Sequence, residues 1–167
     1  VNLVKPSKLY GKLNLSYDDP SKFGVDRFLS MLAAIERFPD KPLLVIDAGS
    51  AVTFDVIDNQ GMHQGGLIMP GIKSLRGSFI KFSTNDLSLK TSELKNSTKE
   101  GWQSGTHAML VSAINSQIQN FKLQYPDGVI TICGGIVKEI LIELPLQVKF
   151  FDNLVLDGLE SYSQSMG

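Results

Sequence analysis

The stretch LLVIDAGSAVTFDVIDNQGMHQGGLIMPG, residues 43–71, decides the expected fold. Its apolar and β-branched runs predict three strands, at 43–47, 51–57 and 62–68, because each run is bounded by small or turn-forming residues. The segment Asp58-Asn59-Gln60-Gly61 has the composition of a hairpin turn. The three strands are therefore expected to form an antiparallel meander.

Further elements are expected on both sides of this meander. Apolar residues recur at helical spacing over 26–38, after a segment, residues 1–22, that is expected to be extended or loop. Pro70 suits the first turn of a helix that would run to about Phe82. The remaining expected elements are a polar loop at 83–96, a helix at 99–123, a strand at 129–133, a helix ending near Leu144, a strand at 147–151 and a helix at 153–163.

The resulting order, β-β-β-α-β-α-β-α, predicts an α/β fold with a mixed sheet of the ribonuclease-H-like kind. Actin-like ATPases, among them sugar and acid kinases, contain two such sheets, with the nucleotide between them. Residues 39–167 are expected to form one complete domain of this kind, and residues 1–38 a remnant of a first domain with the helix that joins the two. The order of elements does not determine function.

Composition argues against several classes of protein. The 167 residues are 43% hydrophobic and 20% charged, with a formal net charge of −1 and no basic run, so a nucleic-acid partner is not expected. The single cysteine, Cys133, cannot form an intrachain disulfide and favours a reducing, cytoplasmic location. No apolar run approaches the length of a membrane-spanning helix, so no membrane partner is expected.

Asp47 ends a predicted strand and is followed only by the small residues Ala48, Gly49, Ser50 and Ala51. The carboxyl ends of strands face the crevice in which α/β proteins bind ligands. A carboxylate there, with the backbone and hydroxyl donors of Gly49-Ser50, suits a hard cation and a phosphate. The same residues also suit a tight hairpin that Asp47 caps, and residue types alone leave both interpretations open.

Gly24-Val25-Asp26-Arg27 opens a predicted helix. The simplest interpretation makes Asp26 the N-cap, since aspartate is strongly preferred there. The alternative makes Asp26 a general base and Arg27 the partner of an anionic group.

Other candidates are weaker. The pairs Gly65-Gly66 and Pro70-Gly71 would let a ligand approach the backbone, but taken alone they are better explained as a β-bulge and turn residues, and Gly134-Gly135 is a weak motif for a nucleotide site. His63 and His107 lack the spacing of metal ligands and are expected to be structural or exposed, and Trp102 is expected to pack within a helix. The P-loop, Rossmann, GxSxG and HExxH motifs are absent from the sequence. Cys133, where a nuclease of this fold would need an acid, argues against nuclease chemistry.

Taken together, these motifs resemble type III pantothenate kinases. The segments that carry the resemblance are Tyr17, Gly24–Arg27, DAGSAVT at 47–53, GGLIMPG at 65–71, residues 96–105, ICGG at 132–135 and DNLVLDGL at 152–159. The resemblance implies ATP-dependent phosphorylation of pantothenate to 4'-phosphopantothenate, the first step of coenzyme A biosynthesis.

The resemblance also implies roles for individual residues. Asp26 would be the general base for the primary hydroxyl of pantothenate, and Asp47 would hold a monovalent cation, K⁺ or NH₄⁺. Gly49 and Ser50 would contact ATP, which binds with Mg²⁺; Ser50 replaces a threonine that is usual in the family. The residues implied to contact pantothenate are Tyr17, Gly24, Val25, Asp26, Arg27 and, across a homodimer interface, Thr98.

One departure from the family pattern is substantial. The family begins with a strand that carries a DxGN[ST] phosphate-binding element, and these 167 residues contain no such element. The chain is therefore expected to be the C-terminal portion of such a kinase and to need a missing N-terminal half. The alternative is a catalytically inactive homologue that acts as an accessory, regulatory or assembly module, a class to which some relatives have been assigned. Retention of Asp26, Asp47 and Thr98 favours the enzyme.

Overall fold

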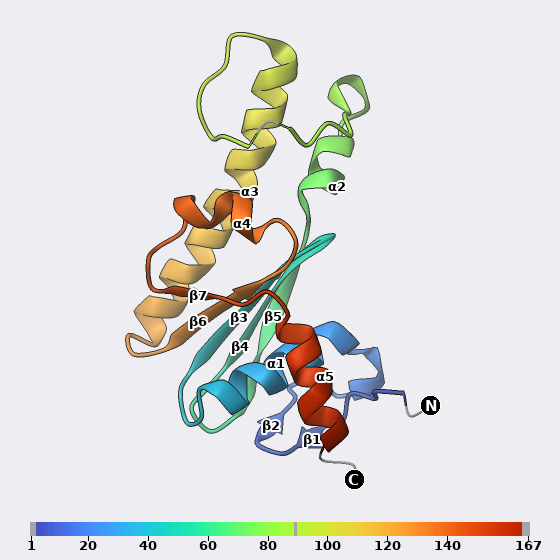
Figure 1. Ribbon diagram of the computed structural model, residues 1–167, viewed down its shortest axis with the longest axis vertical. Helices are drawn as coiled ribbons and strands as arrows, with labels where there is room; N and C mark the ends of the chain where they lie inside the picture. Colours follow the sequence, from blue (N-terminus) through green and yellow to red (C-terminus); the bar gives the residue numbers. More distant parts are fainter. Residues whose placement is uncertain (1–2, 89, 165–167) are drawn as a thin grey trace.

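Figure 1 shows a computed structural model of the protein, which describes residues 3–88 and 90–164. Its centre is a five-stranded mixed sheet with the strand order β5-β4-β3-β6-β7. The strands are β3 (Leu43–Ala48), β4 (Ala51–Ile57), β5 (His63–Pro70), β6 (Val129–Cys133) and β7 (Val148–Phe150). The first three are antiparallel neighbours, whereas β6 runs parallel to β3, and β7 parallel to β6. This is the expected ribonuclease-H-like arrangement.

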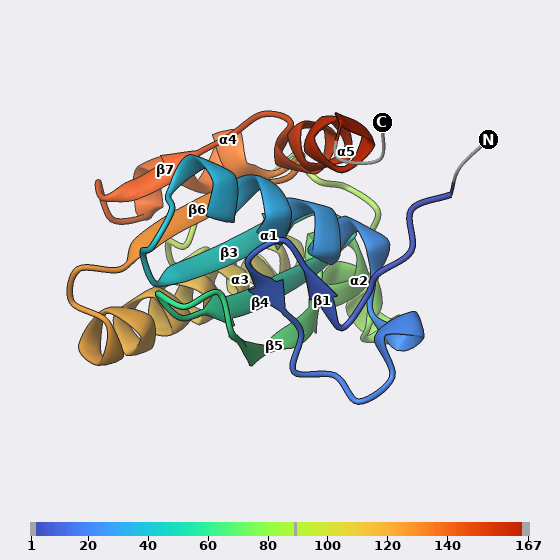
Figure 2. The ribbon, with the colours of Figure 1, turned by 90° about the horizontal axis from the view of Figure 1, so that it is seen from below.

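Helices cover both faces of the sheet. They are α1 (Val25–Arg37), α2 (Ile72–Gly77), α3 (Thr98–Gln124), α4 (Val137–Ile140) and α5 (Leu154–Gln164), with short 3-10 helices η1 (Pro20–Lys22), η2 (Ile80–Phe82) and η3 (Leu141–Glu143). Figure 2 shows α1 and α5 on one side of the sheet and α3 on the other. None of the helices in the described part of the chain is long and apolar enough to cross a membrane.

Strand β3 supplies apolar side chains to two separate cores. Leu43 and Val45 pack with α1 and α5, while Leu44 and Ile46 pack with α3 and α4. Alternate side chains of a strand point to opposite faces, so a strand that is covered on both faces is apolar throughout. The continuous apolar run that predicted this strand therefore reflects its central place in the sheet.

The N-terminal segment contains a small hairpin that the sequence did not predict. Strands β1 (Leu9–Tyr10) and β2 (Leu13–Asn14) are joined by a turn in which Gly11 has a φ of +56°. Leu13 is fully buried in the core of α1 and α5, and Tyr10 stacks on Tyr162 of α5 with ring centroids 4.9 Å apart. This segment therefore packs onto the sheet domain, and its assignment to a remnant of another domain stays a prediction.

Two predicted helices were wrong in extent. Pro70 ends strand β5, paired with Ala51, and α2 begins only after Gly71. A proline is tolerated at this place because β5 lies at the edge of the sheet. The helix expected to reach Leu144 is instead the four-residue α4 followed by η3. Leu144 precedes a proline, which disfavours helical geometry at that residue. The predicted loops include Val1, Asn2 and Leu89, which lie outside the described residues.

Candidate active site

A cavity of about 260 Å³ lies where α1 begins and β3 ends. The loop after β3 and the first residues of β4 complete its wall. Its lining residues are Gly24, Val25, Asp26, Arg27, Asp47, Gly49, Ser50, Ala51 and Thr53. Two motifs that are about 20 residues apart in the sequence thus meet at one site.

Asp26 is the second residue of α1 and not its N-cap. The N-cap is Gly24, which makes no side-chain capping bond, so the capping interpretation of Asp26 was wrong. The Asp26 side chain is exposed at the cavity. Within residues 3–88 and 90–164 it makes no hydrogen bond or ion pair, which leaves both carboxylate oxygens able to accept a proton.

Asp47 lies one residue before the end of β3 and is partly buried. Burial raises the pKa of this carboxyl, and the negative charge of Asp26 raises it further. The turn after β3 is closed by the backbone, since the Gly49 amide donates to the Ala51 carbonyl at 2.9 Å. The tight hairpin of the alternative interpretation is thus present, with only Gly49 and Ser50 between β3 and β4. The Asp47 side chain takes no part in the bond that closes this turn.

The donor set at this cavity fits a cation. Two carboxylates, Asp26 and Asp47, face the same space closely enough for one to disfavour ionisation of the other. No group of three or more histidine, cysteine or acidic residues that could hold a metal occurs in the described part of the chain. A cation at Asp47 would therefore complete its shell with carbonyl, water or ligand oxygens, which suits a hard ion.

The glycines near the cavity are needed for close packing of backbone against backbone. A Cβ atom on Gly71 would lie 2.6 Å from the carbonyl oxygens of both Gly49 and Ser50. Gly134 has a φ of +114°, and a Cβ atom there would lie 2.4 Å from the carbonyl oxygen of Ala48. The loop after β5 therefore packs on the turn after β3, and the loop after β6 packs on the last residue of β3.

The Gly65-Gly66 pair also has a structural explanation. Gly65 has a φ of +109°, next to an irregularity in the pairing of β4 with β5 between Val56 and Ile57. A Cβ atom on Gly66 would lie 2.5 Å from Asp55 Oδ1 and 2.6 Å from Arg27 Nη2. The interpretation of this pair as part of a β-bulge is confirmed, and the close packing at Gly66 adds a second structural reason for glycine.

Arg27 is buried and paired with Asp55 of β4. Its Nε donates to Asp55 Oδ2 at 2.9 Å and its Nη2 donates to Asp55 Oδ1 at 2.6 Å. Burial alone would lower the pKa of Arg27, but the hydrogen bond and charge of Asp55 outweigh it and the pKa is raised. The Arg27 Nη1 also lies 3.4 Å from the Tyr17 hydroxyl, so Tyr17 stands beside Arg27 without lining the cavity.

His63 completes this buried group. Its Nε2 lies 2.9 Å from Asp55 Oδ1, and its Nδ1 lies 3.0 Å from Ser16 Oγ. Because a carboxylate only accepts, Nε2 carries the proton and donates to Asp55. The expectation that His63 is structural or exposed is confirmed, since this histidine is buried and has a structural role.

Sequence reasoning missed Asp55, although a charged residue at an inward position of the apolar strand β4 was a usable signal.

A second cavity, also about 260 Å³, lies between α2, α3 and the loop after β6. Gly135 and Ile136 line it together with apolar residues such as Ile72 and Leu110. Because Gly135 and Ile136 follow β6, this cavity also lies at the carboxyl end of the sheet.

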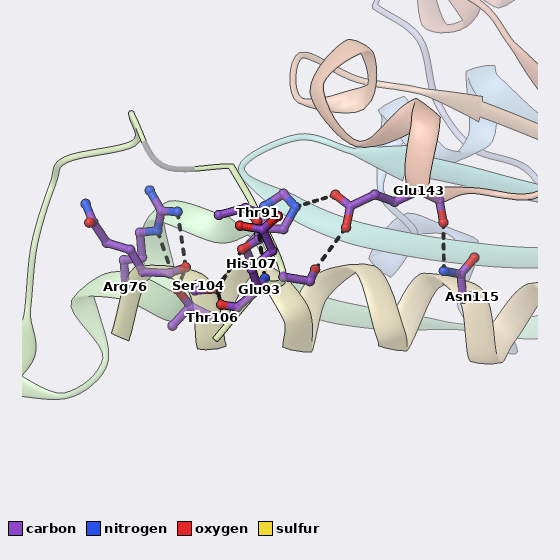
Figure 3. Close-up of polar contacts among 10 residues, drawn as sticks. Arg76, Thr91, Glu93, Ser104, Thr106, His107, Asn115 and Glu143 are labelled. Carbon is purple, nitrogen blue, oxygen red and sulfur yellow. Dashed lines mark hydrogen bonds and ion pairs between the residues drawn. The ribbon is translucent and has the colours of Figure 1, made fainter. Parts of the chain in front are cut away.

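Buried polar contacts shape the wall of this second cavity (Figure 3). Arg76 is buried, and burial lowers its pKa although Asp86 opposes that effect. Its Nη1 donates to the carbonyl of Asp86 at 2.7 Å, which ties the loop after η2 to α2. His107 Nε2 lies 2.6 Å from Glu143 Oε1, whose backbone carbonyl accepts from Asn115 Nδ2 at 3.1 Å. Arg76 and Glu143 thus help to hold α2, α3 and η3 together.

Thr98 is not brought to the first cavity. It is the first residue of α3, is exposed, and follows the N-cap Ser97, whose hydroxyl accepts from the Glu100 amide at 3.3 Å. Figure 1 shows the start of α3 projecting beyond the sheet, at the end of the molecule away from α1. Trp102, one turn later, packs on Phe79 and Phe82, as a packing role predicted.

Residues 1–120 match the family model described as type III pantothenate kinase. The chain belongs to the type III pantothenate kinase family. A type III pantothenate kinase of Hahella chejuensis is 35% identical over 167 residues, covering 93% of this chain and 65% of the relative. One of Teredinibacter turnerae is 33% identical over 132 residues, covering 74% of this chain and 53% of the relative. The chain therefore spans between about half and two thirds of the length of these pantothenate kinases.

A solved structure shares the fold. A conserved Baf family protein from Campylobacter jejuni superposes with a TM-score of 0.56 at 22% identity, covering 87% of this chain and 65% of that one. At this identity the likeness shows the fold alone. Membership in the pantothenate kinase family rests on the sequence matches.

Proposed function

We propose that this chain phosphorylates pantothenate with ATP, as the part of a type III pantothenate kinase that holds the general base and the cation. The observation that carries the proposal is the convergence of Asp26 and Asp47 on one cavity in a chain of this family. The two carboxylates have different surroundings, since Asp26 is exposed and Asp47 is partly buried. No observation favours the accessory-module alternative.

In this mechanism Asp26 accepts the proton of the primary hydroxyl of pantothenate. The hydroxyl oxygen forms a bond to the γ-phosphorus of ATP as the bond to the ADP oxygen breaks, and the proton remains on Asp26. A carboxylate without a protein partner suits this role, because it must stand within hydrogen-bond reach of the substrate. Tyr17 and the segment Gly24–Arg27 hold pantothenate against the start of α1.

The phosphates of ATP lie against the turn after β3. The amide of Gly49 already donates to Ala51, so Ser50, which is exposed, supplies the donors while Gly49 allows close approach. Asp47 would hold a monovalent cation, K⁺ or NH₄⁺, and Mg²⁺ would be bound together with the nucleotide. Such cations neutralise charge on the transferred phosphoryl group, which is the main source of catalysis in this chemistry.

The nucleoside end of ATP reaches toward the loop Gly134-Gly135. The second cavity, lined by Gly135 and Ile136, lies beside this loop and offers mostly apolar walls for a base. The packing of Gly134 on Ala48 supports this direction, because it brings the two cavities to one edge of the sheet. The DxGN[ST] element of the family, supplied by an N-terminal half, would close the other side of the phosphates.

Thr98 of the partner subunit completes the pantothenate site in a homodimer. The distance of the start of α3 from the cavity in its own chain supports a contribution in trans over one in cis.

A cytoplasmic location is part of the proposal and is consistent with Cys133 being a free, buried cysteine. Burial, followed by the charge of Asp47, raises the pKa of the Cys133 thiol to about 12, so this cysteine stays a thiol at neutral pH.

Titration of the ¹⁵N-labelled chain with pantothenate tests the proposal. We expect the amide signals of Gly24–Arg27 and of Asp47–Thr53 to shift, while those of the distant strand β7 stay in place. Titration with pantoate, which lacks the β-alanine moiety, serves as the control for specificity. The absence of any pantothenate-dependent shift in a folded chain would contradict the proposed substrate.

A further inference from the structure

We propose that Asp55 is a positioning residue of the pantothenate site, acting through Arg27 on the first turn of α1. The inference rests on the proposed function, because it concerns the residues that hold pantothenate. Asp55 itself does not line the cavity. Its effect on the reaction therefore has to be transmitted by the side chain that it holds.

The first turn of α1 lacks the usual local support. Its N-cap, Gly24, has no side chain to accept a hydrogen bond from the exposed amides of the turn. Asp26, the proposed base, lies in this turn. The turn is anchored instead by Arg27, whose guanidinium is held on two nitrogens by the two oxygens of Asp55. A bidentate pair fixes direction as well as distance.

Asp55 also links the N-terminal segment to this anchor. The Arg27 guanidinium carbon lies 4.4 Å from the ring centroid of Phe23, and its Nη1 faces the Tyr17 hydroxyl. His63, on the other side of Asp55, faces Ser16. One buried carboxylate thus fixes Arg27 and, through it, both Asp26 and Tyr17.

The neighbouring strand is adapted to this pair. Gly66 of β5 lies opposite Asp55, and a Cβ atom there would meet Asp55 Oδ1 and Arg27 Nη2 as well as the backbone carbonyl oxygen of Phe54. Burying an arginine with a carboxylate often adds little net stability, because both groups lose their hydration. The Arg27–Asp55 pair is therefore better explained by its effect on the position of the first turn of α1 than by a gain in the stability of the protein.

Three variants test this inference. Asp55→Asn removes the charge, and Asp55→Glu keeps the charge but moves the carboxylate. Phe54→Leu is the matched control, because it removes buried volume from the opposite face of the same strand without touching Arg27. Each variant is compared with the wild type in the preparation that phosphorylates pantothenate, and its melting temperature is recorded.

We expect both Asp55 variants to raise the KM for pantothenate at least tenfold and to change the KM for ATP less than twofold. Phe54→Leu is expected to lower the melting temperature and to leave both constants within twofold. In combination with Arg27→Lys, the Asp55→Asn substitution should add little to the KM for pantothenate, since both changes break the same link. Should Asp55→Asn fail to fold, Asp55→Glu carries the same test.

Several results would overturn the inference. These are equal increases in the KM values for pantothenate and ATP, full additivity of Asp55→Asn with Arg27→Lys, or an increase in the KM for pantothenate in Phe54→Leu as large as that in Asp55→Asn.

Amide spectra separate failure of this inference from failure of the proposed function. If the wild type does not phosphorylate pantothenate, the proposed function fails. Asp55 is still upheld as a positioning residue if Asp55→Asn shifts the Asp26 and Tyr17 signals and Phe54→Leu does not.

Discussion

Asp26 and Asp47 face one cavity from different environments, and that difference sets their expected roles. Asp26 is exposed at the start of a helix, where the dipole favours a negative charge. Asp47 is partly buried, and burial together with the negative charge of Asp26 raises its pKa. A base that must exchange a proton with substrate suits the first site, and a cation suits the second.

The substitution Asp26→Asn should abolish turnover and leave the fold intact. We expect kcat to fall by roughly 10²- to 10⁴-fold, the usual contribution of a general base. Because the side chain is exposed and makes no bond within the described residues, stability should change by less than about 0.5 kcal/mol. Steady-state assays and thermal unfolding measure the two effects. Near-normal kcat in this variant would rule out Asp26 as the base.

Asp47→Asn should change how stability depends on pH. The folded protein binds the Asp47 proton more tightly than the unfolded chain does, because the pKa is raised on folding. Stability therefore falls as the pH rises from the ordinary aspartate range through the raised pKa, and this loss is absent from Asp47→Asn. Melting curves between pH 4 and 8, at low salt, should show the variant melting above the wild type at neutral pH.

Added K⁺ should reverse that difference if Asp47 holds the cation. We expect K⁺ to raise the melting temperature of the wild type more than Na⁺ does at equal ionic strength, and to leave Asp47→Asn unchanged. Identical responses of the two proteins to K⁺ would refute the cation assignment, and parallel pH curves would refute the raised pKa.

At the residue scale, the sequence was informative about residues within short motifs and uninformative about partners brought together by folding. Asp26 and Asp47 could be chosen because their neighbours form recognisable patterns. A charge within the apolar strand β4 could have drawn attention to Asp55, but its role could not be predicted, since its partner Arg27 is 28 residues away. The capping interpretation of Asp26 failed because the helix begins one residue earlier than expected, with Gly24 as its N-cap.

At the scale of elements, the loops that follow β5 and β6 depend on glycine to pack closely against the end of β3 and the turn after it. Gly134 illustrates this, because its positive φ and its contact with the Ala48 backbone both exclude a side chain. Gly135, the next residue, has open space around its Cα and no unusual φ. The two neighbours therefore form a matched pair for mutagenesis.

Gly134→Ala should destabilise the chain by about 3 kcal/mol, from backbone strain and overpacking against β3. Gly135→Ala should stay within about 0.5 kcal/mol of the wild type. Urea unfolding of the two variants measures the difference. Equal stabilities would show that the loop after β6 does not pack on β3 as described.

Strands β3, β4 and β5 were predictable because their apolar runs are long and are interrupted by turn residues. The sequence predicted a helix from Pro70 where the strand continues. The fixed φ of proline, near −65°, fits the start of a helix, but proline is equally tolerated in an edge strand, where its missing N–H is not needed for pairing. The hairpin β1–β2 has two-residue strands, which are too short to leave a periodic pattern.

At the scale of the whole molecule, the order β-β-β-α-β-α-β-α was enough to predict the sheet, because connection rules allow few arrangements of these elements. The order could not show how the site is completed. Thr98 does not line the cavity of its own chain, and it is the first residue of α3, which starts at the end of the molecule away from α1 (Figure 1). The relatives are also longer than this chain.

Mixing two inactive variants tests whether the site is shared between subunits. In a heterodimer of Asp26→Asn and Thr98→Ala chains, one of the two sites would combine an intact Asp26 with an intact Thr98. We expect a re-equilibrated equal mixture to regain about a quarter of wild-type activity, since half of the dimers are mixed and each has one complete site. Activity no higher than the average of the parent variants would exclude a contribution of Thr98 in trans.

The most direct test of the central claim is formation of 4'-phosphopantothenate from pantothenate and ATP, with Mg²⁺ and K⁺ present. The 167-residue chain is assayed with and without the N-terminal half of a relative that carries the DxGN[ST] element. We expect product when the half is supplied, none when the chain carries Asp26→Asn, and little from the chain alone. No product from the folded, complemented chain, or undiminished product with Asp26→Asn, would contradict the claim that this chain holds the base of a pantothenate kinase.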